Sequence, residues 1–176
     1  MQLRYFFMKL TEEIYRNPDV NWDFRVTLVE PEIPPNTGNI GRVCLGTGAS
    51  LHLVEPLGFD LGEKQLRRAG LDYWKHLKVN RYSNLDSFLN EADPSFEKVY
   101  LTTKAKKSVF DHQFSDKTYF LFGKETAGLP VSLLEKHPER CLKIPMFDDR
   151  VRSFNLANSV SVVVFEALRQ QLARVF

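Results

Sequence analysis

The sequence is poor in cysteine and has no long apolar run. Its 176 residues include two cysteines, Cys44 and Cys141, which lie far apart and form no pairing pattern. Sparse cysteine favours a reducing compartment over a secreted, disulfide-bonded protein. No stretch approaches the roughly 18 apolar residues of a membrane span, and the apolar run at residues 5–8 is too short for the core of a signal peptide. We therefore expect a cytoplasmic protein with no membrane partner.

The net charge is also small, at +2 from 24 basic and 22 acidic residues. This balance neither requires nor excludes nucleic acid, because binding depends on where charges cluster. Basic residues gather in three short segments, at residues 64–75, 104–107 and 150–152. A basic cluster alone is more often a solvated surface. The first segment also carries Tyr73 and Trp74, and basic side chains among aromatic rings suit contacts to phosphates and stacked bases.

Strand-like and helix-like segments alternate after an N-terminal stretch without a clear strand. We expect residues 1–24 to form an extension and residues 25–176 to form one domain. Strands are expected at residues 24–29, 51–54, 77–79, 98–101, 118–122 and 141–144. Helices are expected at residues 38–46, 83–89, 131–136 and after residue 153. The alternation predicts an α/β fold with a mostly parallel sheet and helices on both faces. Residues 30–37 are expected to be a loop because they contain two consecutive prolines.

The last helix is apolar on more than one side. Its main apolar stripe repeats every four residues, at Leu156, Val160, Val164, Leu168 and Leu172. Residues 162, 163 and 165 add apolar surface outside this stripe. Such a helix is either central in the fold or shared with a second subunit. We favour the shared interface, and hence a homodimer.

Several kinds of site are not supported by the sequence. The four histidines lie far apart and no cysteine pair accompanies them, so no metal site is expected. There is no G-x-S-x-G elbow, and Cys44 falls on the apolar side of its expected helix, which is typical of an inert thiol. The glycines of residues 41–48 are not followed by the lysine of a phosphate-binding loop. The two prolines before them make a dinucleotide site a weak hypothesis.

Three separated motifs point to a family. They are NTGNIGR at residues 36–42, LFGKETAGLP at 121–130, and IPM at 144–146 followed by RSFNLANSV at 152–160. Each alone is compatible with a turn or a helix cap. Taken in this order with EPEIPPNTGNI, RRAGLDYW and LTTK, they resemble the SPOUT superfamily of RNA methyltransferases. The resemblance is strongest to its small tRNA 2′-O-methyltransferases, which modify the wobble nucleotide, and it covers nearly all of residues 25–176.

The resemblance implies a C-terminal trefoil knot that forms a pocket for S-adenosylmethionine. The matching cofactor-binding positions are Leu101, Thr102, Gly123, Glu125, Gly128, Ile144, Met146, Ser153 and Leu156. Apolar side chains among them suit the walls around an adenine ring, and glycine allows the backbone to come close to a ligand. The sulfonium is already an activated methyl donor, so the protein has to bind and orient it.

The resemblance also implies a tRNA substrate and a homodimer. Arg42 and Asn36 match the catalytic motif. The very high pKa of arginine disfavours a general base, so we expect Arg42 to anchor a phosphate and stabilise the alkoxide, with Asn36 holding Arg42 or the ribose. The expected RNA-binding residues are Arg42, Arg67, Arg68, Arg150, Arg152 and Asn155.

Two questions stay open on the sequence alone. The segment between Pro145 and Ser153 reads one residue longer than the pattern, so either Arg150 or Arg152 takes the RNA-facing role. The alternatives to a wobble methyltransferase are an enzyme that modifies another tRNA or rRNA position, and an RNA-binding or assembly protein that keeps the fold without catalysis.

Overall fold

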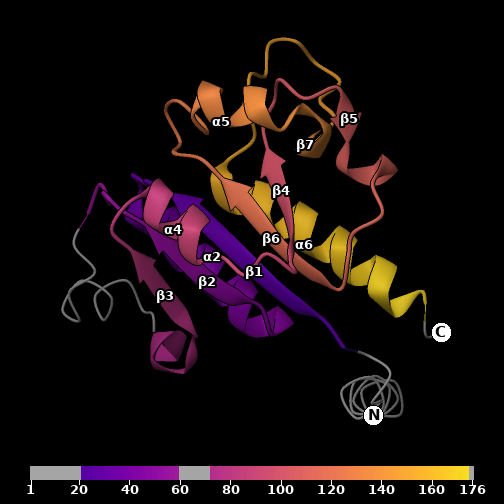
Figure 1. The fold of residues 1–176 in the computed structure, drawn as a ribbon. Helices are drawn as coiled ribbons and strands as arrows, with labels where there is room; N and C mark the ends of the chain where they lie inside the picture. The colour runs from indigo at the N-terminus through magenta and orange to yellow at the C-terminus, as the bar shows by residue number, and fades with distance from the viewer. Residues whose placement is uncertain (1–20, 60–71, 175–176) are drawn as a thin grey trace, which may run out of the picture.

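The computed structural model describes residues 21–59 and 72–174, which build one parallel sheet with helices on both faces (Figure 1). The strands are β1 (Asp23–Val29), β2 (Ser50–Val54), β3 (Val79–Tyr82), β4 (Glu97–Leu101), β5 (Lys107–Ser108), β6 (Lys117–Phe122) and β7 (Cys141–Lys143). Their order is β3-β2-β1-β6-β4-β7-β5, and neighbouring strands pair in parallel. The expected α/β class is therefore confirmed.

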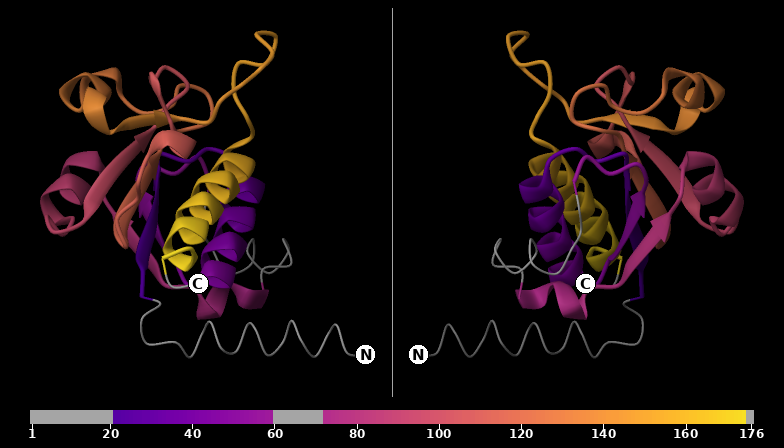
Figure 2. Two further views of the ribbon diagram at one scale, coloured as in Figure 1. Left: turned by 90° about the vertical axis from the view of Figure 1, so that its right-hand side faces the viewer. Right: turned by 90° about the vertical axis from the view of Figure 1, so that its left-hand side faces the viewer.

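Two layers of helices cover the sheet (Figure 2). The helices are α2 (Pro34–Thr47), α4 (Leu85–Glu91), α5 (Val131–Lys136) and α6 (Leu156–Leu172), with 3-10 turns η1 (Asp72–His76), η2 (Val109–Asp111) and η3 (Pro138–Arg140). Helices α2 and α6 pack side by side on one face, and α4 and α5 cover the other. Both faces of β1 are buried, Val26 and Leu28 toward α2 and α6 and Val29 toward α4, as parallel sheets require.

The start of α2 corrects the expected loop at residues 30–37. The helix begins at Pro34, with both prolines in its first turn. Proline is tolerated there because its missing N–H would have no partner inside the helix. Asn36 is consequently held in a helical turn, where its backbone N–H donates to the carbonyl of Ile33. The helix ends at Gly48, whose φ of 74° is the left-handed conformation that glycine adopts easily.

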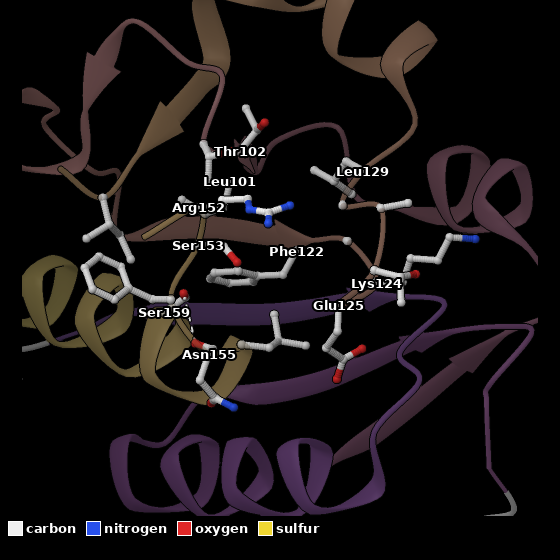
Figure 3. Close-up of a pocket in the computed structure, with 18 of the residues that line it drawn as sticks. Leu101, Thr102, Phe122, Lys124, Glu125, Leu129, Arg152, Ser153, Asn155 and Ser159 are labelled. Carbon is white, nitrogen blue, oxygen red and sulfur yellow. Dashed lines mark hydrogen bonds between the residues drawn. The ribbon is translucent and has the colours of Figure 1, made fainter. Parts of the chain in front are cut away.

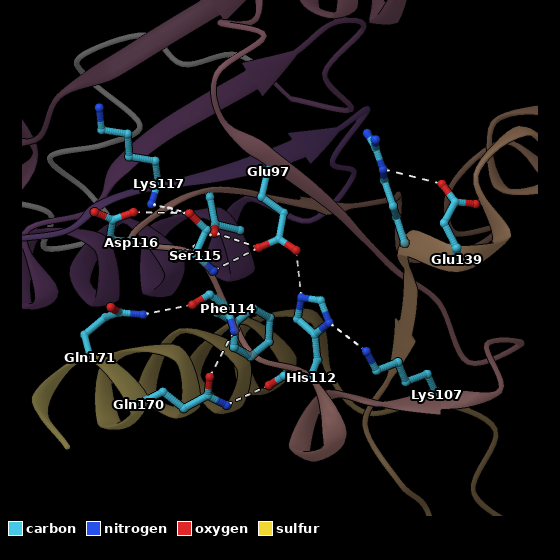
Figure 4. Close-up of polar contacts among 12 residues, drawn as sticks. Glu97, Lys107, His112, Phe114, Ser115, Asp116, Lys117, Glu139, Gln170 and Gln171 are labelled. Carbon is cyan, nitrogen blue, oxygen red and sulfur yellow. Dashed lines mark hydrogen bonds and ion pairs between the residues drawn. The ribbon is translucent and has the colours of Figure 1, made fainter. Parts of the chain in front are cut away.

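Side chains at both ends of helix α6 hydrogen-bond to backbone groups. At its start, Oδ1 of Asn155 accepts hydrogen bonds from the N–H groups of Ala157 and Asn158 at 2.9 and 3.3 Å, which caps the helix. Near its end, Oε1 of the buried Gln170 accepts from the Phe114 N–H, and Nε2 of Gln171 donates to the Phe114 carbonyl (Figure 4). These bonds give hydrogen-bond partners to the N–H and the carbonyl of Phe114, in a segment that the helix covers.

The same segment is tied to β4 by Glu97 (Figure 4). Its carboxylate accepts hydrogen bonds from Nε2 of His112 at 2.8 Å, the Ser115 N–H at 3.0 Å and the Thr118 hydroxyl at 3.2 Å. Burial opposes the ionisation of Glu97, but these three donors outweigh it and lower the pKa of the carboxyl below its ordinary value.

The expected N-terminal extension and the expected lack of a membrane span can be compared with the structure. Residues 1–20 of the expected extension lie outside the described residues, and β1 already begins at Asp23, ahead of the expected boundary at residue 25. Among the helices that the structure describes, none is both long and apolar enough to cross a bilayer.

Candidate active site

A cavity of about 490 Å³ opens where β4 and β6 end (Figure 3). Ligands of α/β proteins commonly bind outside the carboxyl ends of parallel strands, and the volume falls in the usual range for small-molecule pockets. The walls come from the loops after β4 and β6, from the first turn of α2 and from the segment that leads into α6.

Most of the expected site residues meet in this cavity. Those that line it are Asn36, Leu101, Thr102, Gly123, Glu125, Gly128, Ile144, Arg152, Ser153, Asn155 and Leu156. Met146, Arg42 and Arg150 lie outside the lining. Arg67 and Arg68 fall outside the described residues. Segments more than 100 positions apart in the sequence therefore line one cavity.

A chain of hydrogen bonds connects the three motifs. Nδ2 of the buried Asn36 donates to Oε1 of Glu125 at 2.9 Å. Oδ1 of Asn36 in turn accepts from Nδ2 of Asn155 at 2.9 Å. Since Asn155 also caps α6, the start of α2, the loop after β6 and the start of α6 are locked to one another. The amide of Asn36 thus joins the start of α2 to the loop after β6 and to the start of α6. That Asn36 holds Arg42 or the ribose stays a prediction.

A second set of hydrogen bonds connects the loop after β1 to the loop after β6. The Glu32 carboxylate accepts from both the N–H and the hydroxyl of Thr126 at about 3 Å, while the Glu32 N–H donates to Oε2 of Glu125 at 2.9 Å. Nζ of Lys124 donates to Oε2 of Glu30 at 2.7 Å, and this contact raises the pKa of the lysine. Glu30, Glu32 and Thr126 were not among the expected site residues.

The two glycines of the loop after β6 serve the loop itself. A Cβ built on Gly123 would lie 1.9 Å from the carbonyl carbon of Gly128, a distance no side chain can tolerate. Gly128 has a φ of 73°, and its N–H donates to the Lys124 carbonyl at 2.8 Å. Gly123 is thus required by the close approach of two backbone segments.

The two candidate arginines of the segment before α6 lie differently. Arg152 lines the cavity beside Ser153 (Figure 3). The side chain of Arg150 is 86% exposed and forms an ion pair with Asp148 at 2.5 Å. Of the two candidate arginines, Arg152 therefore lies at the cavity and Arg150 lies outside its lining.

Comparison with known proteins identifies the family of the chain. The sequence profile of the SpoU rRNA Methylase family matches residues 23–165. The chain belongs to this family. It is 48% identical over 149 residues to the tRNA (cytidine(34)-2′-O)-methyltransferase of Burkholderia cenocepacia, covering 84% of this chain and 95% of the relative. The Saccharophagus degradans protein of the same name is also 48% identical, with the same coverage.

Solved structures resemble the fold of this SpoU-family chain over most of its length. A structure that concerns 2-OH methylation of C/U34 on tRNA has a TM-score of 0.81 and 38% identity, covering 88% of this chain and 99% of that one. An AdoMet-bound rRNA methyltransferase from Sinorhizobium meliloti has a TM-score of 0.74 and 26% identity, covering 85% of this chain and 57% of that one.

The cavity of this SpoU-family chain is lined by both polar and apolar side chains, and Cys44 lies outside it. Cys44 is buried among apolar side chains, and burial raises the pKa of its thiol to about 12, so it carries no thiolate at neutral pH. Within residues 21–59 and 72–174, no group of three acidic, histidine or cysteine side chains could hold a metal ion. The residues present can hold and orient ligands.

Proposed function

We propose that this chain is an S-adenosylmethionine-dependent methyltransferase that acts on the ribose 2′-OH of the wobble nucleotide of tRNA, a cytidine or a modified uridine. The observation that carries the proposal is the single cavity in which the three motifs are locked together by Asn36, Glu125 and Asn155. The names of the two 48% identical relatives and the subject of the structure with a TM-score of 0.81 support the same reaction and nucleotide.

The cavity suits S-adenosylmethionine. Leu101, Ile144 and Leu156 supply apolar walls for a planar base, and Thr102 and Ser153 supply hydroxyls for the polar parts of the ligand. Gly128 faces open space, which leaves room for a ligand next to its backbone. When bound, the cofactor supplies an activated methyl group. The protein fixes the orientation of the two substrates.

On the RNA side, we assign Arg42 to anchoring a phosphate next to the target ribose and to stabilising the developing alkoxide. Arginine side chains are poor general bases, so we assign Arg42 no proton transfer. Arg152, which lines the cavity, is the better-placed second contact to the RNA. Asn36 acts by holding the walls of the cavity in place.

A homodimer accompanies this proposal. Phe165 and Val162 on α6 are 56% and 38% exposed, although they are large apolar residues, and Leu45 of the neighbouring α2 is 37% exposed. An apolar surface of this kind suits a second copy of the chain. Arg42 lies outside the cavity of its own chain, which agrees with a site shared by two subunits. We also propose a C-terminal trefoil knot and a cytoplasmic location, and both rest on the family resemblance.

The decisive experiment is methyl transfer from labelled S-adenosylmethionine to total tRNA from cells that lack this protein, followed by mapping of the label. A 2′-O-methyl group at nucleotide 34 is the expected result. Label at another tRNA position would keep the chemistry and overturn the substrate. If tRNA takes up no label, the same assay is repeated with rRNA, and label there would also overturn the substrate. Cofactor binding without transfer to any RNA would favour an RNA-binding or assembly protein.

A further inference from the structure

Arg42 is held by an aromatic residue from a distant part of the chain. Its guanidinium carbon lies 5.1 Å from the centre of the Tyr73 ring, within the range of a cation–π contact. Tyr73 belongs to η1, which packs against α2. The Tyr73 hydroxyl donates a 2.5 Å hydrogen bond to the carbonyl of Gly38, one helical turn before Arg42. The ring is therefore fixed to the same helix that carries the arginine.

Trp74, the residue after Tyr73, packs η1 against α2. A Cβ on Gly41 would lie 2.9 Å from Cζ3 of Trp74, so the indole already touches the helix backbone. Trp74 and Leu77 both join the core that contains α2. Because those two side chains attach η1 to α2, the contact of Tyr73 with Arg42 is an additional feature of the interface.

An exposed arginine ordinarily samples many rotamers, and ordering it costs conformational entropy. A ring placed beside the guanidinium restricts that freedom before a ligand arrives and leaves the N–H groups at the edge of the plane available to an anion. We propose that Tyr73 is a positioning residue that pre-orients Arg42 for an RNA phosphate. The proposal rests on the function proposed above, because it gives the orientation of Arg42 a purpose.

The test compares substitutions at residue 73 in the full chain, with and without Arg42. Tyr73→Leu removes the ring and is expected to weaken tRNA affinity and to slow the single-turnover transfer. The product of the two effects is expected to be about tenfold. Tyr73→Phe keeps the ring and is expected to stay within about threefold of the unmodified protein. Tyr82→Leu is the matched control, because Tyr82 is also half-buried and hydrogen-bonded but lies on β3, away from the cavity. S-adenosylmethionine affinity is expected to be unchanged in all three.

The decisive arm is Tyr73→Leu in the Arg42→Ala background, measured by tRNA dissociation constant. No further loss is expected there, since the guanidinium that the ring orients is already absent. An equal further loss would overturn the proposal and make Tyr73 an independent RNA contact or a purely structural residue. Unchanged tRNA affinity and transfer rate for Tyr73→Leu alone would also overturn it. Neither of these results touches the proposed function, which fails only if the unmodified protein transfers no methyl group to RNA.

Discussion

The Nδ2 group of Asn36 lies 2.9 Å from Oε1 of Glu125, and the two residues are buried or half-buried at the wall of the cavity. The pair connects the first turn of α2 to the loop after β6, which are 89 positions apart. An amide donor facing a carboxylate is a charge-assisted hydrogen bond. The contact therefore depends on the identity of both side chains, and their shapes alone would not maintain it.

Asn36→Asp is expected to disrupt this contact with almost no change of shape. The donor is lost and a second carboxylate faces Glu125, so we expect a loss of about 1–3 kcal/mol in the free energy of unfolding at neutral pH, together with weaker cofactor binding. Urea unfolding and calorimetric titration with S-adenosylmethionine measure the two effects. Asn80→Asp on β3, outside the cavity, is the control. Equal losses for both variants would contradict a special role for the pair.

Gly123→Ala is expected to be far more damaging than its small size implies. The new methyl group would overlap the backbone of Gly128 and Leu129, and two backbone segments cannot both move without breaking the Lys124–Gly128 bridge. We expect more than about 3 kcal/mol of destabilisation or failure to fold. Gly46→Ala is the matched control, because nothing lies within 4 Å of its Cβ position in α2, and it should stabilise the protein by about 0.5–1 kcal/mol. Thermal unfolding of both variants measures the difference. Similar unfolding temperatures for the two would contradict the close backbone approach at Gly123.

The alternation of strands and helices along the chain could be predicted from the sequence, because buried parallel strands are short apolar runs and the helices carry a different period. The two-residue strand β5 was too short to show such a pattern. The start of α2 could not, because Pro34 excludes a helix interior but not a first turn. The contacts of Glu32 with Thr126 were also out of reach. They join residues 94 positions apart, and only the pairing of β1 with β6 brings those loops together.

For α6, the sequence could show that the helix has too much apolar surface but not which residues are outward. Val164 and Phe165 are neighbours of similar character, yet Val164 is fully buried against the sheet and Phe165 is exposed. A stripe repeated every four residues drifts around a helix of 3.6 residues per turn. Of the three apolar residues off the stripe, Val163 is fully buried and only Val162 and Phe165 are exposed. We therefore expect Val162 and Phe165 to contact a second subunit.

Phe165→Asp is accordingly expected to convert a dimer to a monomer that remains folded. The charge would be placed on the exposed apolar surface of α6, where it interferes with a second copy but not with the core. Val164→Asp should instead unfold the protein, because it buries a carboxylate among apolar side chains. Sedimentation velocity and circular dichroism separate the two outcomes. A Phe165→Asp protein that sediments as a dimer would move the interface away from this surface.

Protein stability is expected to fall below neutral pH because of His52. The imidazole is 4% exposed on β2, with Nδ1 2.9 Å from the Tyr82 hydroxyl and Nε2 3.0 Å from the Ser50 hydroxyl. Burial, with a smaller contribution from the charge of Arg25, lowers the pKa of His52 to about 4. The unfolded chain takes up this proton at its ordinary pKa of about 6.5. Between those values the unfolded state binds the proton and the folded state does not.

The stability that neutral His52 provides is therefore fully present above about pH 6.5 and is lost as the pH falls toward 4. From pH 7.5 to pH 5 we expect this residue to remove about 2 kcal/mol from the free energy of unfolding. His52→Gln should flatten that dependence, whereas His76→Gln, at an exposed position of η1, should leave it as in the unmodified protein. Urea unfolding at the two pH values measures the difference. A pH dependence that survives in His52→Gln would assign the acid sensitivity to other groups, such as the carboxyl of Glu97, whose lowered pKa also favours the folded state at higher pH.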